Sequence, residues 1–261
     1  SDETTLVASS ALKTLTRCGQ QYEEEHHDDI IEKRQYGVDG DERINLDKPM
    51  PHPFQERPRI GIRLYVRGNT KRFLSALVGE LTNWISKTRL KSANLLKHIV
   101  FLCEEHLTIE AHTLFPSYIK ALVFSKNDAD DELYRVLLDT FEMVGRYTPV
   151  EVYIRYVLPR LRGDAEVTPF GVDSATREAA LEFLGALLNG SKSCQLPEFF
   201  VEIATTLSDS FVLPLDNEGI RSAAMNNILI LLTHVRGASG QGLRKVIEKA
   251  FLKTGRLNIN D

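Results

Sequence analysis

The fold is decided by two related stretches of sequence, DELYRVLLDTFEMVGR at residues 131–146 and DSATREAALEFLGALL at residues 173–188. Each stretch begins with an aspartate, carries an arginine four residues later and continues with apolar residues at helical spacing. This spacing places the apolar side chains on one face of a helix, and an acidic first turn complements the helix dipole. Both stretches are therefore predicted to form amphipathic helices.

The pattern recurs along the chain, with intervals of 46, 42 and 44 residues between equivalent arginines. Repeats of about 40–47 residues made of two helices are typical of HEAT and armadillo arrays. A single helix pair cannot bury its apolar stripe alone, so stacked pairs share one continuous core. The sequence predicts an all-α fold, a HEAT/armadillo-type α-solenoid of about four to five helix pairs.

The repeated polar residues are expected to hold the array together. An acidic residue at a helix N-terminus accepts hydrogen bonds from free backbone N–H groups. We expect each arginine to pair with this acid or with the equivalent acid of the next repeat. The arginines are Arg89, Arg135, Arg177 and Arg221, and the acids that precede the last three are Asp131, Asp173 and Asp216.

The chain divides into three parts on this interpretation. Residues 1–35 are predicted to form a helix that belongs to a preceding repeat, because the chain lacks an initiator methionine and reads as a piece of a longer protein. Residues 36–58 contain four prolines among charged residues and predict an extended or partly disordered inter-repeat loop. The remaining array, 59–261, divides into repeats at 59–106, 107–147, 148–190 and 193–236 and a terminal helix at 239–255.

The composition excludes several classes of protein. The chain has 261 residues and a net charge of −4, which argues against a bulk nucleic-acid binder. Its three cysteines lie 85 and 91 residues apart, so neither a disulfide framework nor a zinc site is expected, and a reducing compartment fits best. No stretch approaches 18 uncharged apolar residues, so no membrane partner is expected.

No motif of a known active site occurs in a supporting context, so we expect no enzyme and no cofactor. Residues 23–29 (EEEHHDD) resemble a metal site in composition, but adjacent helical residues point about 100° apart, and a solvated helix end is the better interpretation. The glycine-rich residues 237–242 follow a predicted helix and lack a GK[ST] ending, which favours a turn over a phosphate site.

The main candidate for a binding surface is a basic block. Residues 57–97 carry 10 basic and 1 acidic side chains, a net charge of +9. Four of the basic residues repeat every four positions, which stacks them along one side of a helix. We expect either a docking strip for an acidic partner or a solvated outer face, and nucleic acid is less favoured because few aromatic residues are interleaved. The strip comprises Arg59, Arg63, Arg67 and Lys71, with Arg72 beside it.

Trp84, the only tryptophan, lies at the predicted turn between the first two helices of the array, with Lys87 close by. A tryptophan at such a turn is either a packed lid over the core or an anchor for a partner. The packed lid is the favoured interpretation, and the anchor stays open.

Residues 60–106 resemble a known family, the HEAT-repeat axonemal dynein assembly factor. The resemblance rests on GIRLYV at 61–66, FLSAL at 73–77, LTNW at 81–84, KTRLKSANLL at 87–96 and EEH at 104–106. It implies a cytoplasmic, non-catalytic scaffold or co-chaperone for the pre-assembly of axonemal dynein arms. The implied partners are dynein chains and chaperones or other assembly factors, and no catalytic or metal residue is carried over.

Two other functions remain open. A tubulin-binding HEAT array would use basic or aromatic residues on successive turns, and Trp84 with Lys87 fits the first of these turns. The basic block would suit a transport-receptor or RNA-associated scaffold, although no feature of the sequence is typical of base recognition. Against tubulin binding, the later turns of the array carry acidic residues that would repel the acidic surface of tubulin. These residues are Asp128, Asp130, Asp131, Asp164, Glu166, Asp209 and Asp216.

Overall fold

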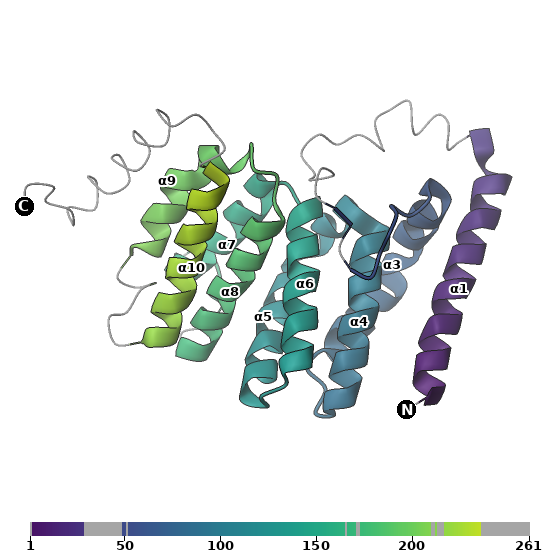
Figure 1. The fold of residues 1–261 in the computed structure, drawn as a ribbon, viewed down its shortest axis with the longest axis horizontal. Coiled ribbons are helices and arrows are strands. Elements are labelled where there is room, and N and C mark those ends of the chain that lie inside the picture. Colours follow the sequence, from purple (N-terminus) through teal and green to yellow (C-terminus); the bar gives the residue numbers. More distant parts are fainter. Residues whose placement is uncertain are drawn as a thin grey trace, which may run out of the picture.

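The computed structural model describes residues 2–28, 49–50, 52–164, 166–170, 173–209, 212 and 217–235. Within these ranges all regular secondary structure is helical and no strand occurs, so the predicted all-α fold is confirmed. Four antiparallel helix pairs follow one another, preceded by α1 (Figure 1). The helices are α1 (Asp2–Glu25), α3 (Ile60–Glu80), α4 (Ser86–Cys103), the 3-10 helix η1 (Glu104–Glu110), α5 (Ala111–Asn127), α6 (Asp131–Tyr147), α7 (Val150–Arg162), α8 (Ser174–Gly190), α9 (Leu196–Leu207) and α10 (Glu218–Val235).

The pairs stack into a two-layered solenoid. The second helices α4, α6, α8 and α10 pack side by side in chain order, and α5, α7 and α9 lie behind them in Figure 1. Helix α1 packs against α3 at one end of the array. One cluster of buried apolar side chains runs without a break from Ile62 to Leu231. The stripe that each pair cannot bury alone is thus covered by the next pair.

Polar side chains cap several helices at their N-termini. Asp173 accepts a hydrogen bond of 2.8 Å from the backbone N–H of Thr176, as expected for the acid that opens this repeat. At α6 the cap is one residue earlier than expected, because Asp130 accepts from the N–H of Leu133 and Asp131 lies exposed in the first turn. Asn217 caps α10 by accepting from Ile220 N at 3.0 Å, and Asp216 lies outside the described residues.

Helices α6 and α8 approach each other so closely that only glycine fits between them. A Cβ atom on Gly190 would lie 1.8 Å from the carbonyl oxygen of Glu142, and one on Gly145 would lie 2.1 Å from the carbonyl oxygen of Leu187. Side chains also join these helices, since Asn189 Nδ2 donates to Glu142 Oε2 at 2.8 Å. The second-helix layer is therefore held by backbone contact as well as by apolar packing.

The described end of the proline-rich loop lies on the second-helix layer rather than standing away from it. The ring of Phe54 stacks on that of Phe101 in α4 with centroids 3.7 Å apart. Arg146 of α6 donates a hydrogen bond of 2.8 Å to the carbonyl oxygen of Pro49. Residues 49–50 and 52–58, hereafter the 49–58 segment, thus bridge two repeats.

Several expectations lie outside the described residues, namely helix residues 29–35, most of the loop 36–58 and the terminal helix 239–255. Among the helices that are described, none combines the length and apolar character needed to cross a membrane.

Candidate functional site

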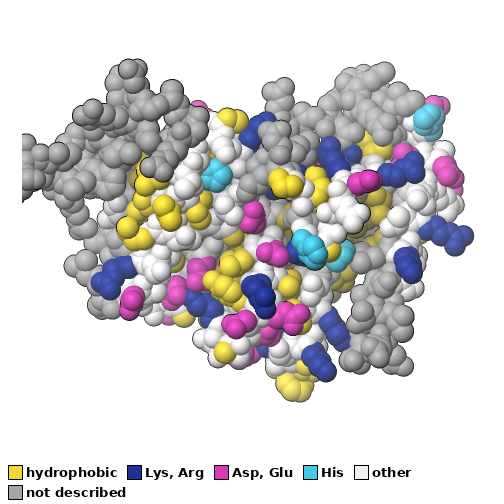
Figure 2. All heavy atoms as spheres, viewed as in Figure 1, with side chains coloured by type: hydrophobic (Ala, Val, Ile, Leu, Met, Phe, Trp, Pro, Cys, Tyr) yellow, Lys and Arg dark blue, Asp and Glu magenta, His cyan; other side chains and the backbone are white. Residues whose placement is uncertain are grey.

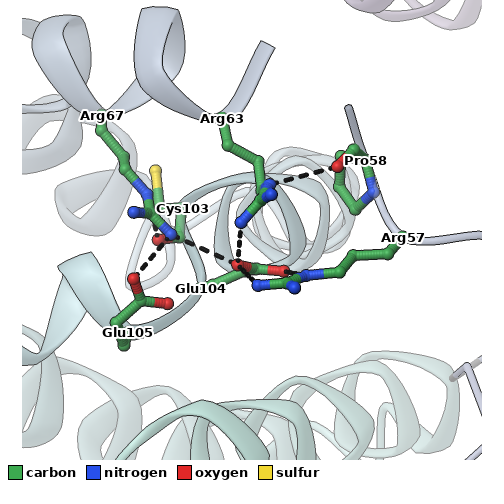
Figure 3. Close-up of polar contacts among 7 residues, drawn as sticks. All are labelled: Arg57, Pro58, Arg63, Arg67, Cys103, Glu104 and Glu105. Carbon is green, nitrogen blue, oxygen red and sulfur yellow. Dashed lines mark hydrogen bonds and ion pairs between the residues drawn. The ribbon is translucent and has the colours of Figure 1, made fainter. Parts of the chain in front are cut away.

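The basic block does not form one exposed row of side chains. Three of its arginines, Arg57, Arg63 and Arg67, converge on the carboxylate of Glu104, which is fully buried (Figure 3). Arg57 binds both oxygens at 2.7 Å, Arg63 Nη1 lies 2.9 Å from Oε2, and Arg67 Nη2 lies 3.3 Å from the same oxygen. We call these four residues the Glu104 cluster.

The Glu104 cluster forms where α4 ends and η1 begins. Glu104 has a φ of 49°, in the left-handed region, and this kink turns its side chain back toward α3. Arg67 also donates to the carbonyl oxygen of Cys103 at 3.0 Å and lies 2.9 Å from the carboxylate of Glu105. Arg63 donates to the carbonyl oxygen of Pro58. The arginines therefore compensate a buried charge and bind two carbonyl groups, one at the end of α4 and one just before α3.

The predicted docking strip is wrong for Arg63 and Arg67, because these side chains point into the protein. Arg63 is only 3% exposed. The four-residue spacing correctly places the side chains on one face of α3, but the junction of α4 and η1 covers part of that face. Arg59 instead lies 3.2 Å from Glu23 of α1, and Lys71 and Arg72 remain exposed.

Cys103 lies beside the Glu104 cluster and is fully buried. Its sulfur lies 3.1 Å from the hydroxyl oxygen of Thr70. Burial raises the pKa of the Cys103 thiol to about 11, so the thiol stays protonated near neutral pH. A reactive cysteine is therefore not part of this site.

Trp84 is not a lid over the core, so the favoured interpretation of this residue is wrong. Its side chain is 86% exposed, and that of the adjacent Ile85 is 41% exposed. Both lie in the turn between α3 and α4, at the edge of the solenoid. We call these two residues the apolar tip. The open alternative, an anchor for a partner, is compatible with this exposure.

The turn that carries the apolar tip is held from below by Arg89. This side chain is buried, and its Nη1 donates to the carbonyl oxygen of Asn83 at 2.8 Å. Its Nη2 forms an ion pair with Asp128 in the turn between α5 and α6. Asn83 Oδ1 in turn accepts from the N–H of Ile85 at 2.9 Å. Arg89 thus pairs with an acid of the next repeat and fixes the tip to it.

The equivalent arginines of later repeats lie differently. Arg135 is exposed and donates to the carbonyl oxygen of Asp131 in its own helix. Arg177 is half-buried and Arg221 is exposed. Burial at this position is therefore a property of the first repeat among the four, where it supports the apolar tip.

Lysines flank the apolar tip on α4. Lys87 and Lys91 are both exposed and stand one helical turn apart. Among the described residues neither side chain has an ion-pair partner, whereas Lys97 on the same helix lies 2.8 Å from Asp139. The tip therefore combines exposed apolar surface with two uncompensated positive charges.

The candidate metal site and the hollow beside α6 give less support for a binding site. In the described part of 23–29, Glu23 contacts Arg59 and the ring of His26 stacks on Tyr22. Across the described ranges, no group of three or more His, Cys, Asp or Glu side chains could hold a metal ion. A hollow of about 380 Å³ lies where the 49–58 segment meets α6, but its acidic side chains Asp139 and Glu142 already contact Lys97 and Asn189.

Comparison with known proteins identifies the family. Residues 50–251 match the family model described as "Dynein axonemal assembly factor 5, HEAT-repeat domain". The chain belongs to this family. The match covers all four helix pairs, the Glu104 cluster and the apolar tip, so the HEAT-repeat solenoid predicted from the arginine spacing is confirmed.

Three relatives carry the name dynein axonemal assembly factor 5. The protein from Homo sapiens is 24% identical over 253 residues, that from Xenopus laevis 23% over 214 and that from Mus musculus 21% over 274. The matches cover 92%, 81% and 96% of this chain but only 28%, 22% and 29% of the respective relatives. The chain thus spans less than a third of the length of the relatives that it matches.

Proposed function

We propose that this HEAT-repeat array is a non-catalytic scaffold or co-chaperone that acts in the cytoplasmic pre-assembly of axonemal dynein arms. The observation that carries the proposal is the family match over residues 50–251, together with relatives named as dynein axonemal assembly factors. The partners would be dynein chains and chaperones or other assembly factors.

The architecture suits a scaffold for physical reasons. A solenoid exposes a long surface on each side of a thin core, and stacked helices hold that surface in a fixed shape. Ion pairs between repeats add to this rigidity, since Lys126 contacts Glu178 and Glu182 of α8 in addition to the pair between Arg89 and Asp128. A rigid surface loses little conformational entropy when it binds a partner.

The proposal is tested in ciliated cells that lack the protein. Re-expression of the whole protein is expected to restore the cytoplasmic complexes of dynein heavy and intermediate chains and the arms on the axoneme. The same protein without the four helix pairs should restore neither the cytoplasmic complexes nor the arms. Restoration without these repeats would contradict the proposal.

Tubulin binding is the second candidate and has one observation in its favour, the exposed pair of Trp84 and Lys87. The next turn along the array presents Asp128 and Asp130 instead, and these contact Arg89 and Ser86. A single turn offers too little surface for the repeated contacts of a tubulin-binding array. We therefore expect the purified chain to remain in the supernatant when microtubules are sedimented.

A further inference from the structure

The apolar tip of Trp84 and Ile85 exposes more apolar surface than a turn requires. Scattered exposed apolar residues are common, but here a tryptophan and an isoleucine are adjacent and the tryptophan is 86% exposed. Tryptophan is also the residue type most enriched among the anchors of protein interfaces. The tip therefore has the character of a binding anchor without a partner.

Hydrogen bonds hold the turn of the apolar tip in place before any partner binds. The carbonyl oxygen of Asn83 is fixed by buried Arg89, and Ser86 Oγ donates to Asp130 in the next repeat at 2.6 Å. Asn83 also donates from Nδ2 to Glu80 at 2.6 Å, which closes the end of α3. An anchor on such a turn has its backbone held in place beforehand, which reduces the entropy lost on association.

The charges beside the tip indicate the chemistry of the partner. Lys87 and Lys91 lie exposed in the first turns of α4, which follows Trp84 in the chain, and within the described residues they have no carboxylate partner. Figure 2 shows Lys and Arg side chains over the lower end of α4, with Asp and Glu side chains beside them over α6. We infer that Trp84, Ile85, Lys87 and Lys91 dock an acidic protein segment, which covers the indole with apolar side chains and places carboxylates against the two lysines. This inference rests on the proposed scaffold function and names a class of partner for it.

Acidic residues on the neighbouring helix give the docked segment a direction. Asp131 and Glu132 are exposed in the first turn of α6. They would repel carboxylates, so the acidic part of the partner should lie along α4 and away from α6. A nucleic acid would meet the same acids, and Ile85 offers no ring on which a second base could stack, whereas an apolar side chain of a protein can cover it. A protein segment is therefore favoured over RNA.

The partner class is tested with random peptides displayed on phage and selected on the immobilised chain, with counter-selection on the W84A variant. We expect the enriched peptides to combine aspartate or glutamate with large apolar residues. Trp84 is the only tryptophan of the chain, so its emission reports binding. A synthetic copy of an enriched peptide that lacks tryptophan should shift the emission of Trp84 to shorter wavelength when it binds. W84A and the double variant K87E/K91E should each lower the affinity for the peptide by about tenfold or more.

Two control variants separate docking from general effects. Ile109→Ala removes another exposed apolar side chain, and Lys120→Glu reverses another exposed charge, so both should bind the peptide as the wild type does. Circular dichroism should show the same helical content in all variants, because each altered side chain is exposed. The inference is overturned if selection yields only basic peptides, or no peptide that depends on Trp84, or if poly(U) RNA shifts the fluorescence in place of acidic peptides.

The cell assay separates this inference from the proposed function. If the whole protein restores dynein arms and its W84A/K87E/K91E variant restores them equally well, the docking inference fails and the scaffold function stands. If the whole wild-type protein restores nothing, the scaffold function fails irrespective of the peptide result.

Discussion

Arg63 and Glu104 form an ion pair of 2.9 Å in which both side chains are almost completely removed from solvent. Charges in such a position need full compensation, because their desolvation costs several kcal/mol. Glu104 receives that compensation from Arg57 and Arg67 as well, and the pair between Arg57 and Glu104 fixes the end of the 49–58 segment to the junction of α4 and η1.

Removal of the buried negative charge should therefore destabilise the array. Glu104→Gln would leave three arginines without their shared carboxylate, and we expect the free energy of unfolding to fall by about 3 kcal/mol. Chemical denaturation followed by circular dichroism measures the change. Glu105→Gln is the matched control, because the Glu105 side chain is 25% exposed and its ion pair among the described residues is with Arg67 alone, and it should cost less than about 1 kcal/mol. Equal losses from both variants would show that the cluster does not act as a buried network.

Two glycine substitutions should change stability in opposite directions. Gly190→Ala would place a Cβ atom 1.8 Å from the carbonyl oxygen of Glu142, and the resulting displacement of α8 from α6 should cost about 1–3 kcal/mol. Gly68→Ala adds a Cβ atom in α3 with no heavy atom within 4 Å, and it should stabilise the helix by about 0.5–1 kcal/mol. Thermal unfolding of the two variants decides the matter, and a stabilising Gly190→Ala would refute the close contact of α6 and α8.

The fluorescence of Trp84 reports both its exposure and its charge environment. We expect emission typical of an indole in water from the native protein, with little further red shift on unfolding. Iodide should quench Trp84 more strongly than caesium does, because Lys87 and Lys91 attract anions. In K87E/K91E this preference should reverse. Emission from an apolar environment, or equal quenching by both ions, would contradict the description of the tip.

The cap of α8 should make a contribution to stability that depends on pH. Hydrogen bonds from the backbone of Thr176 hold the pKa of Asp173 below its usual range. A depressed pKa in the folded state means that the stabilisation is present above the unfolded pKa and is lost as the pH falls through the folded pKa. Asp173→Ala should cost about 1 kcal/mol at neutral pH, and this difference should shrink below about pH 4. A difference that is constant with pH, measured by denaturation at several pH values, would exclude the charged cap.

The sequence predicts the helix pairs well because their signals are local and periodic. The spacing of Arg89, Arg135, Arg177 and Arg221 reflects a real repeat, and Asp173 caps the helix that it was expected to open. The capping residue at α6 differs by one position because Asp130 and Asp131 are chemically equivalent in the sequence, and only the backbone geometry selects between them.

The candidate site was harder to predict because it depends on which face each residue presents. Helical spacing places Arg63 and Arg67 on one side of α3 but does not show that Glu104 lies opposite, since that contact spans about 40 residues. The two acids that follow the apolar run of α4 were the available signal. For Trp84 the sequence favours a packed lid and leaves a partner anchor open, and only the geometry of the turn shows that no described residue covers the indole.

The 49–58 segment is expected to change the order in which the repeats unfold. In a simple linear array each repeat contacts only its neighbours, so unfolding can begin at either end and spread one repeat at a time. The hydrogen bond from Arg146 to Pro49 joins residues 97 positions apart, and Phe54 stacks on α4 from the same segment. We therefore expect α3 to α6 to open as one cooperative block with slow amide hydrogen exchange, while α9 and α10 exchange first. On this expectation the 49–58 segment, together with the packing of neighbouring repeats, sets the size of the folding unit.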